Sequence, residues 1–365
     1  MEKIIYDVLD TIEKAGFEAY IVGGYVRDFL MKKKSLDIDI CTNARPKDLM
    51  LLFASYQAMA LECGNVSVQS KNYKFEITTY RKEIKYIDNR KPEEIEYIDK
   101  LSEDIKRRDF TVNTICMNKE GKITDLLSGK ADIKKKIIRS LGDPNLKLEE
   151  DSLRIMRAIR FATVLKFKLD PKLKEAIKNN KDLLKNLSYE RKKEELTKVF
   201  ASENKKYGVG LLKELNLLTS LDLVNIEYVL RTNDLIGMWS LITKEDTYPF
   251  SKHEKPLIKE IKDLMDLDLS DPFVLYKYGI YSSSIAADLK KQNKKKIIKK
   301  YNNLQVKDKN EIKIKAEDIC QILNKEPGKF LKDIFEDLEK QIIIRKLKNE
   351  EKALKDYIIS KYDML

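Results

Sequence analysis

Histidine and cysteine are scarce in this 365-residue sequence, which limits the chemistry open to it. The single histidine, His253, has no companion with which to form a zinc site. The four cysteines, Cys41, Cys63, Cys116 and Cys320, show no Cys-x-x-Cys spacing. Scattered thiols of this kind are typical of a reduced protein with buried cysteines, not of a disulfide framework.

Long apolar runs are also absent. No stretch approaches the roughly 18 to 20 apolar residues that a helix needs to cross a bilayer. The N-terminus lacks the pattern of a signal peptide. We therefore expect a protein that has no membrane partner and is located in the cytoplasm.

Charge, by contrast, is abundant. Charged residues make up 36% of the chain, and 72 Lys and Arg against 60 Asp and Glu give a net charge of +12. A basic surface attracts phosphates and releases counterions from a polyanion, so the surplus points toward nucleic acid. A compositional bias toward Lys and Ile is the alternative explanation. The hydrophobic content of 42% indicates a globular chain, and its length suggests about two to four compact units.

Two aspartates in the run KSLDIDICT carry the most information. In a β-strand, Asp37 and Asp39 would project from one face roughly 6 to 7 Å apart, while Ile38 and Ile40 would enter the core. Two hard oxygen ligands at that separation suit Mg²⁺. Taken alone, such a pair is more often a solvated strand end.

A Gly-Gly turn lies upstream of this pair. Gly23 and Gly24 open the segment GGYVRD at 23–28, fourteen residues before Asp37. A glycine turn that begins a short helix exposes backbone N–H groups and suits phosphates, although most such turns are purely structural. Phosphate and magnesium sites together predict nucleotide chemistry.

A third polar motif is RRDFTVN at 107–113. One interpretation is a helix start at which Asp109 or Thr111 acts as the cap. The functional interpretation is that Arg108 meets triphosphate oxygens while Asp109 and Asn113 meet the sugar. The two interpretations are compatible.

The fourth motif, EEDSLRIMRAIRF, repeats polar residues every three positions. Asp151, Arg154, Arg157 and Arg160 would form a ridge on a helix, beside apolar residues that include Phe161. The ridge can be a salt-bridged face, but guanidinium groups within so much apolar surface need partners. Ionised Asp only accepts hydrogen bonds and Arg only donates them. An Asp151–Arg154 pair would therefore match the pairing edges of cytosine and adenine and reject those of guanine and uracil.

Hydrophobic periodicity predicts strands in the first part of the chain. EAYIV at 18–22 fits a strand, and the alternating runs 66–70 and 74–80 fit a hairpin whose turn contains Asn72. The polar residues 81–94 have no clear periodicity. We expect them to form a mobile loop.

Helical patterns flank these strands and then dominate the chain. Helices are expected near 25–31, after Pro46, and at 149–165, 171–185 and 189–201, with several more to the end. No internal repeat is evident.

The stretch 288–315 is rich in lysine. A charge run is usually a solvated helix face, but here it is also a candidate for contacts with backbone phosphates.

Together these motifs resemble one family, the bacterial class II tRNA nucleotidyltransferases, which are CCA-adding enzymes of the polymerase β superfamily. The resemblance covers nearly the whole chain. It rests on GGYVRD, DIDI, RRDFTVN, SLGDPNLKLEED at 140–151, EEDSLRIMRAIRF, YERKKEELTKVF at 189–200 and a C-terminal tail at 324–358, in this order.

The resemblance implies an α+β fold in which a nucleotidyltransferase head with a mixed sheet precedes an all-helical neck, body and tail. We place the head at 1–140, the neck with the base reader at 141–200, the body at 201–255 and the tRNA-binding tail at 256–365. The sequence has no HD-type histidine motif, so the phosphohydrolase extension of some relatives should be absent.

The same resemblance implies a role for each site residue. Asp37 and Asp39 would hold two Mg²⁺ ions, with Glu76 a candidate third carboxylate or a solvent-facing strand residue. The other expected contacts are Gly23, Gly24, Arg27 and Arg108 to phosphates, Asp109 and Asn113 to the ribose, Asp151 and Arg154 to the base, and Arg157 and Arg160 in support of the nucleotide.

The implied reaction is the addition of C, C and A to the tRNA 3′ end from CTP and ATP, with no nucleic-acid template and no obligatory protein partner. The stretch 78–97 resembles the flexible loop that CC-only members lack, which disfavours CC-only activity. A-only addition and a bacterial poly(A) polymerase are the enzymatic alternatives. A noncatalytic RNA-binding protein on the same scaffold is the alternative of another class, and intact Asp37 and Asp39 argue against it.

Overall fold

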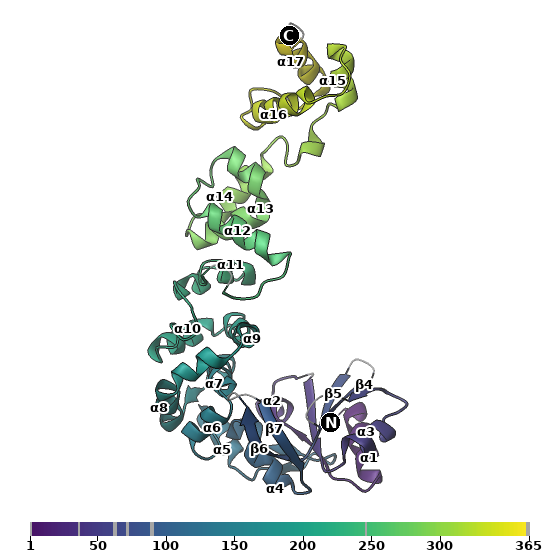
Figure 1. The fold of residues 1–365 in the computed structure, drawn as a ribbon, viewed down its shortest axis with the longest axis vertical. Helices are drawn as coiled ribbons and strands as arrows, with labels where there is room; N and C mark the ends of the chain where they lie inside the picture. The colour runs from purple at the N-terminus through teal and green to yellow at the C-terminus, as the bar shows by residue number, and fades with distance from the viewer. Residues whose placement is uncertain are drawn as a thin grey trace. The chain divides into compact units, whose positions relative to one another are not determined.

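The computed structural model describes residues 2–35, 37–60, 64–70, 73–87, 91–244 and 247–362 (Figure 1). The predicted turn residue Asn72 and the thiol of Cys63 lie outside these residues. The chain divides into two compact units, Met1–Leu223 and Val224–Leu365.

A seven-stranded mixed sheet forms the centre of the first unit (Figure 1). Its strands lie in the order β3-β4-β5-β2-β1-β8-β9; β2 and β5 run parallel, and their neighbours pair antiparallel. The predicted strand at 18–22 and the pairing of the two hairpin strands are confirmed. The strands are β1 Ala19–Val22, β2 Asp37–Thr42, β3 Gln57–Ala60, β4 Asn65–Ser70, β5 Tyr73–Thr79, β8 Cys116–Met117 and β9 Ile123–Thr124.

The two faces of strand β2 have different surroundings. Ile38 and Ile40 are buried in a core cluster that includes residues of helices α1 (Lys3–Lys14) and α3 (Pro46–Leu52). Cys41 belongs to a second apolar cluster on the opposite face. Because side chains alternate along a strand, Asp37 and Asp39 share the face of Cys41, as the sequence predicts.

The prediction of a loop at residues 81–94 is wrong. Strands β6 (Arg81–Ile87) and β7 (Lys91–Tyr97) pair antiparallel in a sheet of their own, with register shifts after Glu83 and Lys85. The sequence of this ribbon shows no clear alternation of apolar residues. A search for alternating apolar residues therefore overlooks it.

The predicted helix at 149–165 is two helices. α6 (Pro144–Glu150) ends before Asp151, whose backbone is extended, and α7 (Leu153–Leu165) begins after Ser152. The Asp151 carboxylate accepts a hydrogen bond from the Leu153 N–H at 3.0 Å, which satisfies a free donor of the new helix.

The other helices of the first unit agree better with the predictions from the sequence. The prediction at 171–185 becomes α8 followed by a 3-10 helix at Lys181–Asn186. The remaining elements are α2 Gly24–Leu30, α4 Leu101–Asp104, α5 Gly129–Lys135, α8 Pro171–Asn179, α9 Tyr189–Phe200 and α10 Lys205–Glu214, with the short strands β10 Ile137–Ile138 and β11 Lys168–Leu169 paired parallel.

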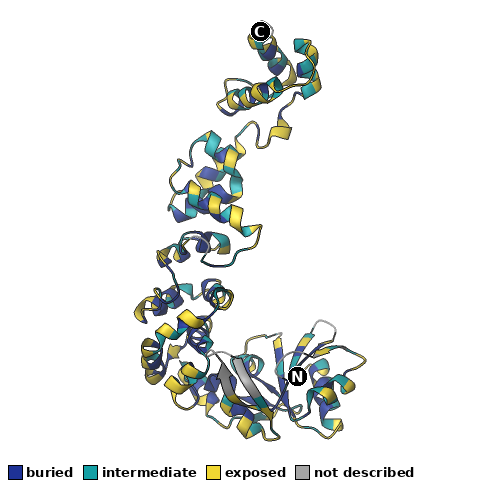
Figure 2. Cartoon of the chain, viewed as in Figure 1, coloured by how far each residue is buried: buried dark blue, intermediate teal, exposed yellow. Residues whose placement is uncertain are grey.

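The second unit is built from helices in its described part, and each helix turns buried residues inward (Figure 2). At its C-terminal end, Asp337 accepts hydrogen bonds from Tyr357, Lys361 and Tyr362, which ties α16 to α17. Every helix in the described part of the chain is too short or too polar to cross a membrane. The helices are α11 Leu235–Ser240, α12 Glu254–Leu264, α13 Pro272–Leu289, α14 Lys294–Asn302, α15 Ala316–Leu323, α16 Phe330–Ile343 and α17 Glu351–Tyr362.

Two glycines of α10 provide a test of how α7 is held. A Cβ atom on Gly208 would lie 2.6 Å from Thr163 Oγ1 and 2.6 Å from Val199 Cγ1, whereas one on Gly210 would meet nothing within 4 Å. We expect Gly208→Ala to lower the free energy of unfolding by about 1–3 kcal/mol through overpacking against α7. Gly210→Ala should raise it by about 0.5–1 kcal/mol because alanine favours the helix. Urea denaturation followed by circular dichroism measures both, and equal effects would contradict the packing.

Candidate active site

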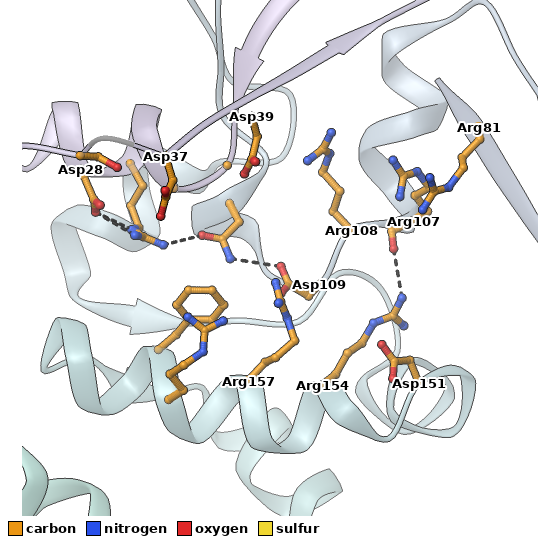
Figure 3. Close-up of a pocket in the computed structure, with 17 residues that line it drawn as sticks. Asp28, Asp37, Asp39, Arg81, Arg107, Arg108, Asp109, Asp151, Arg154 and Arg157 are labelled. Atoms are coloured by element: carbon orange, nitrogen blue, oxygen red, sulfur yellow. Dashed lines mark hydrogen bonds and ion pairs between the residues drawn. The ribbon is translucent and has the colours of Figure 1, made fainter. Parts of the chain in front are cut away.

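A cavity of about 580 Å³ in the first unit collects almost every residue that the sequence analysis singled out (Figure 3). Seven arginines and five aspartates line it, so charge dominates its surface. The lining residues are Gly23, Gly24, Arg27, Asp28, Ser35, Asp37, Asp39, Arg81, Arg107, Arg108, Asp109, Asn113, Asp151, Arg154, Arg157, Arg160 and Phe161.

Asp37 and Asp39 reach the cavity from β2, opposite Arg154 and Arg157 of α7 (Figure 3). Gly23 lies against this pair: a Cβ atom there would be 3.0 Å from Asp39 Oδ2, and its φ of 76° favours glycine. The Gly-Gly turn therefore brings the N-terminal end of α2 close to the carboxylates. The two signals of the sequence, carboxylate pair and glycine turn, form one site.

The electrostatics of Asp39 suit a bound cation. Burial raises the pKa of its carboxyl; Arg108 opposes this rise, and the nearby acids Glu76 and Asp37 add to it. Among the described residues, no Lys or Arg forms an ion pair with Asp37 or Asp39. Two adjacent carboxylates that share a partly buried site are oxygen donors of the kind that a divalent metal ion prefers.

Glu76 lies beside Asp39 in the sheet but is not among the cavity residues. The parallel pairing of β2 with β5 places Asp39 opposite Glu76, and the Glu76 carboxylate accepts a hydrogen bond from Lys74 Nζ at 2.9 Å. Within the described part of the chain, no three His, Cys, Asp or Glu side chains are grouped to hold a metal ion. The carboxylate pair is therefore the better supported part of the metal prediction, and Glu76 stays a prediction.

A continuous chain of hydrogen bonds crosses the cavity wall from α2 to α7 (Figure 3). Arg27 donates from Nε to Asp28 Oδ1 at 2.9 Å and from Nη1 to Asn113 Oδ1 at 2.9 Å. Asn113 Nδ2 donates to Asp109 Oδ1 at 3.1 Å, and Arg157 Nε donates to Asp109 Oδ2 at 2.8 Å. Three predicted nucleotide contacts, Arg27, Asp109 and Asn113, are thus fixed before any ligand binds.

This chain of hydrogen bonds favours the ionised form of the Asp109 carboxyl. Burial acts to raise the pKa of its carboxyl, but Arg157 and the hydrogen bonds from Asn113 and the Phe110 N–H hold it below its usual value. The segment contains the short 3-10 helices Ile105–Arg107 and Thr111–Asn113, and no α-helix begins at Asp109 or Thr111. The capping interpretation is therefore wrong, and Asp109 is a charge partner within the cavity.

Arg154 and Asp151 meet at the other end of α7. Arg154 Nη1 donates to the Lys147 carbonyl and to Glu150 Oε2, both at 2.8 Å, while Nη2 donates to the Arg107 carbonyl at 3.1 Å. Burial raises the pKa of the Asp151 carboxyl, and the nearby Arg154 opposes the rise. The structure brings the predicted donor and acceptor of the base reader to one side of the cavity (Figure 3).

Arg160 completes the set of predicted side chains. Its Nε donates to Glu195 Oε2 of α9 at 2.6 Å. Burial lowers the pKa of the Arg160 guanidinium in spite of this partner.

The sequence analysis did not assign a site role to the other five lining residues, Asp28, Ser35, Arg81, Arg107 and Phe161. Asp28 and Arg107 stand inside motifs that were recognised, so their positions next to Arg27 and Arg108 were the available signal. Arg81 was hidden in the residues expected to form a loop. Phe161 was assigned to the apolar side of the helix.

A buried carboxylate outside the cavity lining organises three of the cavity arginines. Asp104 is fully buried and accepts hydrogen bonds from Arg107 Nε at 2.8 Å, Arg108 Nη2 at 3.1 Å and the Arg81 backbone N–H at 3.2 Å. Burial acts to raise the pKa of the Asp104 carboxyl, but Arg108 and Arg107 outweigh it and lower the pKa.

This cluster predicts a pH-dependent stability. A carboxyl whose folded-state pKa is depressed stabilises the fold fully above its unfolded pKa, about 3.9 for Asp, and this stabilisation is lost as the pH falls through the folded pKa. We expect the free energy of unfolding to fall below about pH 4, and Asp104→Asn to be destabilised by about 3 kcal/mol at pH 7. Denaturation of both proteins between pH 2 and 7 measures the difference, which should shrink toward low pH. A constant difference would refute the ionic contribution.

Comparison with known proteins places these features in one family. Three family models match the chain: a Poly A polymerase head domain at residues 19–139, a probable RNA and SrmB-binding site of polymerase A at 166–222, and a putative tRNA nucleotidyltransferase domain 2 at 252–358. The first match contains β2 and the motif around Asp109, and the second begins just after α7.

Solved structures share the fold over the full length. A Bacillus stearothermophilus CCA-adding enzyme in complex with CTP aligns with a TM-score of 0.84 and 23% identity, covering 100% of this chain and 99% of that one. A Thermotoga maritima CCA-adding enzyme complexed with tRNA aligns with a TM-score of 0.73 and 18% identity, covering 99% and 96%. These likenesses confirm the predicted α+β fold with a nucleotidyltransferase head.

Curated relatives extend the likeness to sequence. The CCA-adding enzyme of Anoxybacillus flavithermus is 31% identical over 96% of this chain and 95% of its own length. That of Bacillus subtilis is 31% identical over 98% of each chain. The chain belongs to the family of CCA-adding enzymes and is a nucleotidyltransferase.

Proposed function

We propose that this protein adds C, C and A to the 3′ end of tRNA, using CTP and ATP and no nucleic-acid template. The observation that carries the proposal is that one cavity holds both the carboxylate pair of β2 and the arginine-bearing helix α7. The carboxylates can serve the reacting RNA end, and the helix can hold and select the incoming nucleotide. The CCA-adding relatives that match the whole chain support the same reaction.

Family membership implies dependence on a divalent metal ion. We propose that the metal is Mg²⁺ and that Asp37 and Asp39 hold two such ions, since their hard oxygen donors and the raised pKa of Asp39 favour small cations. When bound, one ion would lower the pKa of the attacking hydroxyl and the other would stabilise the charge on the triphosphate. Gly23 contributes by leaving the space beside Asp39 Oδ2 open.

The other cavity residues bind and orient the nucleotide in this proposal. The triphosphate would lie along Gly24, Arg27 and Arg108, and the ribose would meet Asp109 and Asn113. The 3′-oxygen of the RNA forms a bond to the α-phosphorus as the bond between the α- and β-phosphates breaks and pyrophosphate leaves. Prior fixing of Arg27 and Asp109 by hydrogen bonds reduces the reorganisation that this step requires.

Base selection would be the work of Asp151 and Arg154. The Asp151 carboxylate accepts from the exocyclic amino group of C or A, and Arg154 donates to the adjacent ring nitrogen. Guanine and uracil would leave these buried groups unpaired. Arg157 and Arg160 would support the nucleotide from the same helix.

The rest of the chain would bind the tRNA. We propose a head at 1–140, a neck at 141–200, a body at 201–255 and a tail at 256–365 that grips the acceptor arm. In the described tail, α14 adds a run of lysines to the basic chain. We propose that the reaction takes place in the cytoplasm and requires no obligatory protein partner.

Ordered nucleotide addition is the direct test. Purified protein with Mg²⁺ is offered tRNA that ends at the discriminator base and each radiolabelled nucleotide, singly and combined. We expect two C, then one A, then arrest, and at least 100-fold slower addition by Asp37→Ala because it removes one of the two proposed metal ligands. Glu175→Ala, which removes an exposed carboxylate of α8, is the control. Open-ended A addition would favour poly(A) polymerase, A addition alone would favour the A-only enzyme, and full activity of Asp37→Ala would refute the metal assignment.

A second prediction concerns base selection. Asp151→Ala should reduce the preference for CTP over UTP about tenfold or more, because the variant has no acceptor that distinguishes the two bases. Asp151→Asn should admit UTP more readily still, since its amide both accepts and donates. Single-turnover incorporation and tRNA binding are measured together. A uniform loss of tRNA binding with the nucleotide preference intact would contradict the assignment.

A further inference from the structure

One aromatic ring in the cavity wall contacts three arginines at once. Phe161 follows Arg160 on α7 and is 8% exposed. The guanidinium carbons of Arg27, Arg157 and Arg160 lie 5.3, 5.3 and 4.1 Å from the centre of its ring. Distances within about 6 Å allow attraction between a cation and the negative face of an aromatic ring.

Each of these arginines also has a carboxylate partner of its own. Arg27 Nη2 lies 2.8 Å from Asp28 Oδ1, Arg157 Nη2 lies 2.6 Å from Asp109 Oδ2, and Arg160 Nε lies 2.6 Å from Glu195 Oε2. The three carboxylates come from different elements, whereas the ring is common to all three guanidinium groups. The hydrogen-bond chain through Asn113 and Asp109 also joins Arg27 to Arg157, but the ring is the one contact shared by all three arginines.

A contact with a ring face leaves the edge of a guanidinium group available. The hydrogen bond and ion pair of Arg160 with Glu195 both use Nε, and among the described residues no hydrogen bond uses its two terminal nitrogens. Guanidinium edges match phosphate oxygens in geometry and charge. A carboxylate in place of the ring would occupy these donors and cancel the positive charge, and an aliphatic side chain would offer the cations no attraction.

The ring is itself held in place from behind. Phe110 packs edge-on against it, with ring centres 5.8 Å apart and an angle of 80° between the planes. Phe110 is 1% exposed and follows Asp109, the partner of Arg157. This packing fixes the ring relative to the hydrogen-bond chain that crosses the cavity.

We propose that Phe161 is a positioning residue for the nucleotide triphosphate, acting as a shared aromatic platform that spaces Arg27, Arg157 and Arg160 and leaves the terminal nitrogens of Arg160 for the ligand. The inference rests on the proposed function for the identity of the ligand, a ribonucleoside triphosphate. Phe161 acts through the arginines and takes no part in bond formation.

A graded series of fluorinated phenylalanines at position 161 tests the platform. Each added fluorine weakens the negative face of the ring with little change in shape, so 4-fluoro, 3,5-difluoro and 3,4,5-trifluoro side chains vary the interaction stepwise. We expect the Kd for CTP, measured by calorimetry with the full chain, to rise at each step and to reach about three- to tenfold above the wild-type value. The melting temperature should change little, because the volume of the ring is retained.

The same series at Phe110 is the matched control. Its ring is also buried and adjoins Phe161, but no cation of the described residues lies over its face. We expect no stepwise change in the Kd for CTP there. A flat series at Phe161, or an equal rise at both positions, would overturn the proposal, since a merely structural role depends on shape.

Nucleotide addition by the wild-type protein separates this inference from the proposed function. If C, C and A are added while the Phe161 series is flat, the platform alone fails. If the Kd for CTP follows the series while tRNA receives no nucleotide, the proposed function fails and the platform stands.

Discussion

The ion pair between the buried Asp109 and the partly exposed Arg157 is the interaction on which the rest of the site depends. It joins residues 48 positions apart, one in the segment between two short 3-10 helices and one on α7. A buried carboxylate is stable only when its oxygens are all satisfied, and here Asn113 and the Phe110 N–H supply the further hydrogen bonds of Asp109. The pair therefore holds the arginines of α7 opposite the carboxylates of β2.

The cavity as a whole follows one electrostatic arrangement. Six of its arginines pair with aspartates or glutamates, some of which lie outside the lining, as Asp104 and Glu195 do. These partners fix the guanidinium groups in position. Asp37 and Asp39 stand apart from these pairs and keep their oxygens available. Such an arrangement is organised before a polyanionic ligand arrives, which is the condition for strong electrostatic stabilisation.

The sequence predicts the parts of this site that depend on the residue pattern within a single strand or helix. The alternation in DIDI fixes which side of β2 faces the core, and the spacing of the α7 arginines fixes their common side. It does not reveal Asp104, whose importance arises from three partners that only the folded chain brings together. The break at Asp151 was missed because Asp151 stands in the three-residue polar repeat that continues through the arginines of α7. Strands β6 and β7 were missed because their sequence shows no clear alternation of apolar residues.

The alternation along β2 also constrains how this protein can vary in length. Inserting or deleting one residue within Asp37–Thr42 would exchange the two faces of the strand, burying carboxylates in the core and turning isoleucines toward the cavity. Substitution of a single side chain leaves the alternation of the strand unchanged. An insertion or deletion of one residue disrupts the core and the site together. Divergence in length should therefore accumulate in connections such as residues 31–35, outside the strand itself.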